Sequence, residues 1–176
     1  AAVALGLMRQ RGVDVRLQAK AAAFTGNGRA NGVVLDSGEQ LQAELLIAAT
    51  GVKPNLDLLA GSGIAHAWGI QVDETLRTSA PDIYAAGDVI ESPNRLTGQR
   101  LVHPIFPNAM EQGRVAGMNM AGSPTVYEGA EKMNSLKHLG LPVIAAGEKQ
   151  ADTVLQQRRG ANLRTLYLSA NCLVGF

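Results

Sequence analysis

Two short apolar runs constrain the fold of this chain more than any other feature of the sequence. Residues 45–51, LLIAATG, form one unbroken run, and residues 83–86, IYAA, form a second. Continuous apolar runs of this length are typical of strands that are covered on both faces, as in the sheets of α/β proteins. The sequence therefore predicts an α/β fold with two buried strands at these positions.

The second run ends on a glycine that is followed at once by a charge, Gly87 and Asp88. In an open α/β sheet the carboxyl ends of the strands border the ligand crevice, so a charge placed there faces whatever binds. A carboxylate accepts hydrogen bonds from sugar or ribityl hydroxyls, and a glycine lets a ligand approach the backbone. A plain turn is the other interpretation of this dipeptide.

Composition excludes several classes of function. The chain of 176 residues has 16 Lys and Arg against 15 Asp and Glu, which provides no basic surface for nucleic acid. A single cysteine, Cys172, cannot close an intrachain disulfide or build a metal cluster, and its apolar neighbours predict a buried side chain. No apolar run approaches the roughly 20 residues of a membrane span. We expect a cytoplasmic protein that contacts no membrane.

Periodicity and turn residues predict the remaining elements. The stretch GNGRANG has glycine spacing close to a dinucleotide fingerprint, but a strand rather than a helix follows it, so a hairpin turn is favoured. A linker after Val52 predicts a domain boundary. We expect helices over residues 1–10, 107–120 and 133–140, and strands over residues 13–17, 21–24, 33–35, 142–146, 163–168 and 172–176.

Three segments together resemble the second half of the flavin-dependent pyridine nucleotide-disulfide oxidoreductase family: LLIAATGVKPN, TSAPDIYAAGDV and NAMEQGRVAGMN. The resemblance covers roughly residues 1–120 well. It implies an incomplete three-layer FAD/NAD(P)-binding α/β fold with a C-terminal α+β dimerisation segment. The implied domains are the end of an NAD(P)-binding domain (1–52), the returning part of an FAD-binding domain (53–122) and part of a dimerisation domain (123–176).

The resemblance also implies cofactors and site residues. The cofactors are FAD and NAD(P)H, Gly51 closes the NAD(P)-binding domain, and Gly87 and Asp88 bind the ribityl chain of the flavin. A turn that enters the next helix lies beside the flavin ring, and it consists of Pro104, Ile105, Phe106 and Pro107. The resemblance identifies no catalytic residue and no metal site. Gln112 and Gly113 also match the family's pattern, and Gly113 is expected to serve close packing rather than binding.

The implied function is transfer of hydride from NAD(P)H to FAD and then of electrons to a disulfide, oxygen or a small redox protein. A homodimer is the expected assembly. The family's glycine fingerprints and redox cysteines are absent, so we expect the chain to be part of a longer protein. His103 is a candidate for proton transfer beside the flavin, whereas His66 and His138 are expected at the surface. The alternative is a noncatalytic module that self-associates through residues 133–176.

Overall fold

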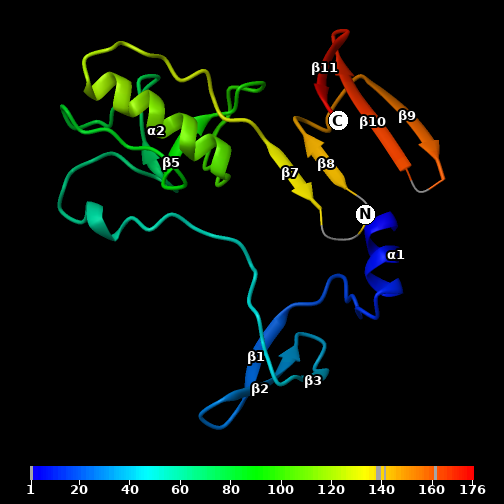
Figure 1. Ribbon diagram of the computed structural model, residues 1–176. Helices are drawn as coiled ribbons and strands as arrows, with labels where there is room; N and C mark the ends of the chain where they lie inside the picture. Colours follow the sequence, from blue (N-terminus) through cyan, green and yellow to red (C-terminus); the bar gives the residue numbers. More distant parts are fainter. Residues whose placement is uncertain (1, 138–139, 141, 161) are drawn as a thin grey trace. The chain divides into compact units, whose positions relative to one another are not determined.

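The computed structural model describes residues 2–137, 140, 142–160 and 162–176, and the chain forms two compact units, Ala1–Gly51 and Val52–Phe176 (Figure 1). The first unit begins with helix α1 (Ala2–Gln10), as predicted. A three-stranded antiparallel sheet follows, in the order β1 (Ala21–Gly26), β2 (Ala30–Leu35) and β3 (Gln40–Gln42). Phe24 pairs with Val33 across the first hairpin. The predicted hairpin around GNGRANG is therefore confirmed.

Two strands predicted in the first unit are wrong. Residues 13–17 and 45–51 have no strand assignment, and Leu45 and Ile47 are 74% and 79% exposed. A buried strand needs hydrogen-bonding neighbours and a cover on each face. The first unit supplies one helix and three short strands that pair with one another, so the apolar run lacks partners within the described residues.

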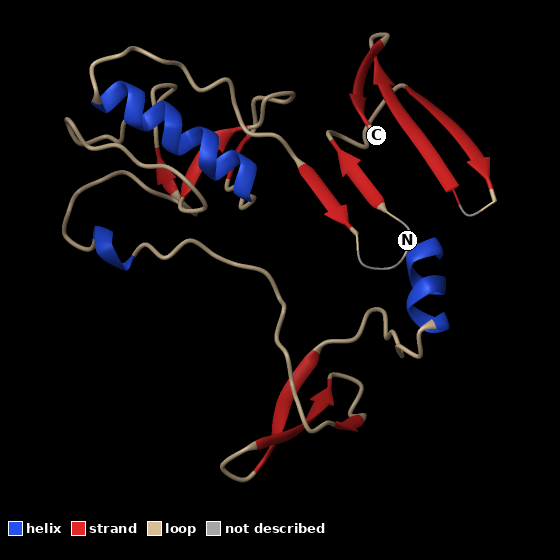
Figure 2. Cartoon of the chain, viewed as in Figure 1, coloured by secondary structure: helices blue, strands red, loops and turns tan. Residues whose placement is uncertain are grey.

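The second unit is built around a small mixed sheet and one long helix. Strand β4 (Ile70–Gln71) pairs in parallel with β5 (Ile90–Pro93), which pairs antiparallel with β6 (Arg100–Leu101). A short 3-10 helix, η1 (Asp57–Leu59), precedes the sheet. Helix α2 (Phe106–Met120) has a proline in its first turn and confirms the helix predicted over residues 107–120. Figure 2 shows these elements by type.

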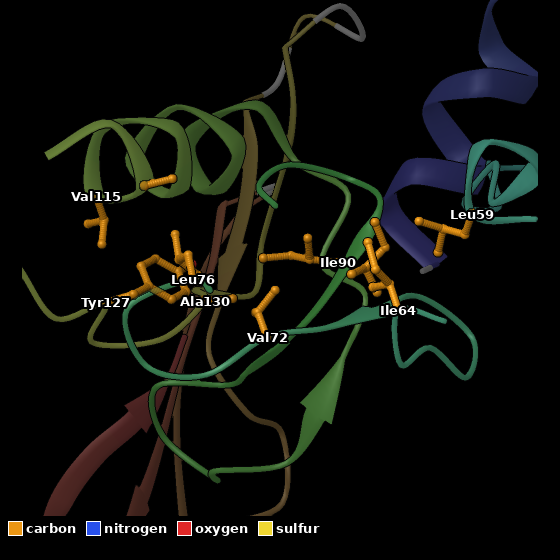
Figure 3. Close-up of a cluster of buried hydrophobic side chains, with 10 residues drawn as sticks. Leu59, Ile64, Val72, Leu76, Ile90, Val115, Tyr127 and Ala130 are labelled. Atoms are coloured by element: carbon orange, nitrogen blue, oxygen red, sulfur yellow. The ribbon is translucent and has the colours of Figure 1, made fainter. Parts of the chain in front are cut away.

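The hydrophobic core of the second unit lies among α2, the sheet and the loops that flank them (Figure 3). Leu76 and Val115 are fully buried, and Ile90 is 1% exposed. The other buried members come from η1, from β4 and the loops beside it, from α2 and from the segment after α2: Leu59, Ile64, Ile70, Val72, Ala116, Tyr127 and Ala130. Burial of each large apolar side chain contributes about 1.5–3 kcal/mol, so this cluster fixes where α2 lies against β5.

The strand predicted over residues 83–86 is wrong. Ile83 is 45% exposed, and Tyr84 forms only an isolated bridge with Arg77. The backbone groups bond locally instead: the Thr78 N–H donates to the Ile83 carbonyl at 2.8 Å, and the Ala85 N–H donates to the Leu76 carbonyl at 3.0 Å. Because these bonds satisfy the segment's polar backbone, it folds as a paired loop and not as a sheet strand.

The C-terminal part of the second unit consists of antiparallel strands. Strands β7 (Met133–Leu136) and β8 (Val143–Ala146) form one pair, and β9 (Thr153–Arg159), β10 (Asn162–Ser169) and β11 (Cys172–Gly175) form a three-stranded sheet. The helix predicted from Met133 is wrong, because this segment pairs with β8. The last three predicted strands are confirmed, whereas the sequence interpretation missed β9.

Three further predictions concern single residues. Cys172 is exposed, so its predicted burial is wrong: it opens β11 directly after the turn at 170–171. A methyl group at Gly113 would meet no atom within 4 Å in the described chain, so close packing at this glycine is also wrong there. His138 lies outside the described residues. Among the described helices, none is long and apolar enough to cross a membrane.

Candidate functional site

The Gly87–Asp88 pair occupies a tight turn that leads into β5. Gly87 has a φ of +88°, and its carbonyl accepts a hydrogen bond from the Ile90 N–H at 3.2 Å. Asp88 is exposed. We call residues 87–90 the acidic turn. The sequence placed Asp88 at the carboxyl end of a strand, but in the structure it precedes one.

A buried glutamine ties the acidic turn to helix α2. Gln112 is 1% exposed, and its Oε1 accepts a hydrogen bond from the Gly87 N–H at 2.8 Å. Its Nε2 donates to the Ser92 hydroxyl at 3.3 Å and to the Tyr127 hydroxyl at 3.2 Å. Burial raises the pKa of Tyr127 above its ordinary value, although hydrogen bonds with Gln112 and Ser92 oppose the rise. The phenol is therefore protonated at neutral pH.

The start of helix α2 presents backbone amides that no side chain caps. The residue before the helix, Ile105, is extended and makes no capping hydrogen bond, and the first turn contains no acidic residue. Phe106 is 76% exposed, and Pro104 and Pro107 are exposed as well. A helix N-terminus carries about half a positive elementary charge. This end of α2 can therefore attract an anionic or electron-rich group.

The structure brings the acidic turn and the beginning of α2 together. A Cβ built on Gly87 would lie 3.9 Å from the Cβ of Ala109, which is in the first turn of the helix. The predicted site residues from 87 to 107 thus belong to two neighbouring segments of one unit. Gly51 is the last residue of the other unit.

Asn108 is a buried amide side chain of α2 that the sequence interpretation missed. It is 5% exposed, its Nδ2 donates to the Glu131 carbonyl at 2.9 Å, and its Oδ1 accepts from the Glu131 N–H at 3.0 Å. Asn108 and Gln112 lie one helical turn apart among the buried residues of α2. That pattern of amides within an apolar stripe is the signal that identifies them.

His103 lies just before the turn that enters α2. Its Nε2 atom is buried and has no hydrogen-bond partner among the described residues. Burial lowers the pKa of His103, a backbone hydrogen bond with Ser92 and the charge of Glu148 raise it, and Lys132 lowers it further; the net shift is downward. The imidazole is therefore neutral near pH 7. His66 is exposed, as predicted, and its Nδ1 lies 2.9 Å from the Ile64 carbonyl oxygen.

The chemistry of these groups suits binding of a polyol beside an electron-rich ring. The exposed carboxylate of Asp88 is a hydrogen-bond acceptor, and the amides at the start of α2 are donors with a positive potential. Within the described residues, no group of three or more His, Cys, Asp or Glu side chains could hold a metal ion. The carboxylate and the helix amides can accept and donate hydrogen bonds to the polar groups of an organic ligand.

Known proteins resemble this chain in sequence and in fold. The sequence model of the family described as "Pyridine nucleotide-disulphide oxidoreductase" matches residues 1–113. The chain is 37% identical over 151 residues to the NADH-dependent phenylglyoxylate dehydrogenase subunit epsilon of Aromatoleum evansii, covering 81% of this chain and 36% of that protein. It is 34% identical over 161 residues to the CoA-dependent NAD(P)H sulfur oxidoreductase of Pyrococcus furiosus, covering 90% of this chain and 36% of that protein.

The fold also matches solved structures. A FAD-dependent pyridine nucleotide-disulphide oxidoreductase from Desulfovibrio vulgaris superposes with a TM-score of 0.87 and 28% identity, over 99% of this chain and 47% of that one. The predicted α/β fold of the FAD/NAD(P)-binding type, present here in part, is therefore confirmed. The chain spans between about a third and a half of the length of these proteins.

Proposed function

Because the chain belongs to the pyridine nucleotide-disulphide oxidoreductase family, we propose that the full-length protein is an FAD-dependent NAD(P)H oxidoreductase. It passes hydride from NAD(P)H to FAD and electrons onward to an acceptor. The names of the two relatives, an NADH-dependent dehydrogenase subunit and an NAD(P)H sulfur oxidoreductase, support this proposal. The acceptor is a disulfide, oxygen or a small redox protein.

The observation that carries the proposal is the position of the acidic turn against the start of α2. Asp88 accepts hydrogen bonds from the ribityl hydroxyls, and Gly87 leaves room for the ribityl chain beside Ala109. Pro104 and Ile105 lead into α2, and Phe106 and Pro107 lie in its first turn, whose amides face the pyrimidine edge of the flavin in this proposal. There the helix dipole stabilises negative charge by about 0.3–2 kcal/mol.

The redox chemistry belongs to the flavin, which when bound accepts hydride and releases electrons. The chain's own residues hold and orient it. Three features suit this role: an exposed acceptor at Asp88, an N-terminus of α2 without an acidic residue, and a glycine at position 87 that carries no side chain. Because the first turn of α2 carries no carboxylate, it does not repel an electron-rich ring.

The proposed domains follow the family. Residues 1–52 end an NAD(P)-binding domain, with Gly51 at its return point, residues 53–122 complete an FAD-binding domain, and residues 123–176 belong to a dimerisation domain. We place the protein in the cytoplasm as a homodimer, and we assign it no nucleic-acid or membrane partner. Exposed apolar side chains on β9–β11 support self-association: Val154, Leu155, Leu163, Leu166 and Leu173.

Substitution of Asp88 tests the flavin role. In the full-length protein, Asp88→Ala is expected to weaken FAD binding about tenfold, because a charged acceptor for the ribityl hydroxyls is lost. FAD affinity is measured by the quenching of flavin fluorescence. Glu74→Ala is the matched control, since it removes one exposed carboxylate of the same unit that is not part of the acidic turn. Equal FAD affinity in both variants would remove the role of Asp88.

Purification of the full-length protein also distinguishes a flavin-dependent oxidoreductase from a noncatalytic assembly module. An oxidoreductase is yellow when purified with FAD and loses its visible flavin absorbance when NADH or NADPH is added without oxygen. A colourless protein that dimerises in sedimentation experiments but takes up no FAD would instead be the noncatalytic assembly module, for which the apolar strands β9–β11 would be the working surface.

A further inference from the structure

We propose that Gln112 is a positioning residue for the flavin: it sets the distance between the Asp88 carboxylate and the N-terminus of α2. This inference rests on the proposed function, which assigns the carboxylate to the ribityl chain and the helix end to the ring. Gln112 reaches neither group directly. It acts through the backbone of Gly87.

The hydrogen bonds of Gln112 leave it one orientation. The Gly87 N–H can only donate, so the Gln112 Oε1 must face it, at 2.8 Å. The Nε2 then faces the hydroxyls of Ser92 and Tyr127. The residue is 1% exposed, so water cannot replace these partners, and an unpaired buried amide is costly. The side chain is therefore held in one place.

The acidic turn is held at both of its ends. At one end the Gln112 Oε1 accepts a hydrogen bond from the Gly87 N–H. At the other end Ile90, the first residue of β5, is 1% exposed and packs in the core. Asp88 lies between these two anchors and is itself exposed. Among the described residues, the bond to Gln112 is the side-chain link that joins this turn to α2.

The same side chain is rigidly joined to the helix end. Gln112 lies six positions after Phe106, the first residue of α2, and α-helical geometry places it about 9 Å along the axis. The Ala109 side chain fills the intervening turn beside Gly87. A helix is rigid over so short a span, so Gln112 keeps a fixed distance from the N-terminus of α2. The Gln112–Gly87 hydrogen bond therefore fixes where the Asp88 carboxylate lies relative to the helix amides.

The experiment compares variants of Gln112 in the full-length protein. Gln112→Leu removes the acceptor for the Gly87 N–H, whereas Gln112→Glu keeps an acceptor oxygen at the same position. We expect FAD affinity to fall about tenfold in Gln112→Leu and by less than about threefold in Gln112→Glu. The visible absorbance bands of bound flavin are expected to shift in Gln112→Leu and to return in Gln112→Glu.

Asn119→Leu is the matched control. Asn119 is an amide on the same helix that bonds the carbonyls of Thr75 and Thr125 and does not contact the acidic turn. We expect it to lower the melting temperature while leaving FAD affinity within about twofold of wild type. If Asn119→Leu weakened FAD binding as much as Gln112→Leu, Gln112 would be a general core residue and the inference would fail.

Amide hydrogen exchange at Gly87 gives a measurement that needs no variant. In the wild-type protein without FAD, we expect this N–H to be protected, because its acceptor is buried; rapid exchange would overturn the inference. A folded Gln112→Leu that binds FAD as wild type does would also overturn it. Wild-type protein that binds no FAD at all would refute the proposed function instead, so the two failures are distinguishable.

Discussion

A glycine in the acidic turn can be required for its backbone conformation or for the space that it leaves, and replacement of Gly87 by alanine separates these two reasons. The backbone has a φ of +88°, which costs an L-residue with a Cβ about 1–2 kcal/mol. Space is not limiting, since the new Cβ would lie 3.9 Å from the Ala109 Cβ, an ordinary contact. The expected loss of unfolding free energy is therefore about 1–2 kcal/mol and is entirely conformational.

Asparagine distinguishes conformation from ligand access at this position. Asparagine adopts positive φ several times more often than other residues with a side chain, so Gly87→Asn should lose less stability than Gly87→Ala. If the ribityl chain approaches the backbone here, both variants bind FAD more weakly, and asparagine, the larger residue, binds it worst. Urea denaturation of the FAD-free protein and FAD titration measure the two effects. Unchanged stability in Gly87→Ala would refute the conformational reasoning.

Two further perturbations follow from the structure. In Gly175→Ala the new Cβ would lie 2.1 Å from the Glu148 carbonyl oxygen, so β11 must move away from the strand end at Ala146. Because the backbone hydrogen bonds there would be lost, we expect the free energy of unfolding, measured by urea denaturation, to fall by about 3 kcal/mol. A fall of less than about 1 kcal/mol would contradict this contact. Burial lowers the pKa of His103 below its ordinary 6.5, so the unfolded chain binds a proton more readily, and stability is lost as pH falls below 6.5. The charges of Lys132 and Glu148 also act on His103. In His103→Phe the melting temperature should fall less as the pH is lowered than it does in the wild type. An identical dependence of melting temperature on pH would exclude the imidazole as the source of the stability loss.

Two local signals in the sequence predicted the local structure correctly. Pro107 at the start, with Gly122 and Pro124 after the end, predicted a helix that the structure places at Phe106–Met120. The glycines of GNGRANG predicted the hairpin between β1 and β2. In both cases the determining interactions lie within a few residues, where turn chemistry and helical periodicity act directly.

Predictions that depended on distant partners failed. The apolar run at 45–51 predicts a buried strand but does not predict which strands would pair with it. Ile47 is exposed in the described chain. Residues 83–86 found backbone partners in 76–78 and not in a sheet. An apolar pattern shows that a segment prefers a covered position, whereas the hydrogen-bonding partner is set by the rest of the fold.

The candidate site shows the same division. The Gly-Asp pair and the proline-led helix could be found from the sequence because each is a local motif. Gln112 matched the family's pattern in the sequence, but its contacts could not be predicted, because a glutamine on a helix is usually solvated and only the fold brings Ser92, Tyr127 and Gly87 around it. The residue that orients the acidic turn is thus separated by 25 positions from the turn itself. A substitution at Gln112 can therefore alter cofactor binding while every residue proposed to touch the flavin is unchanged.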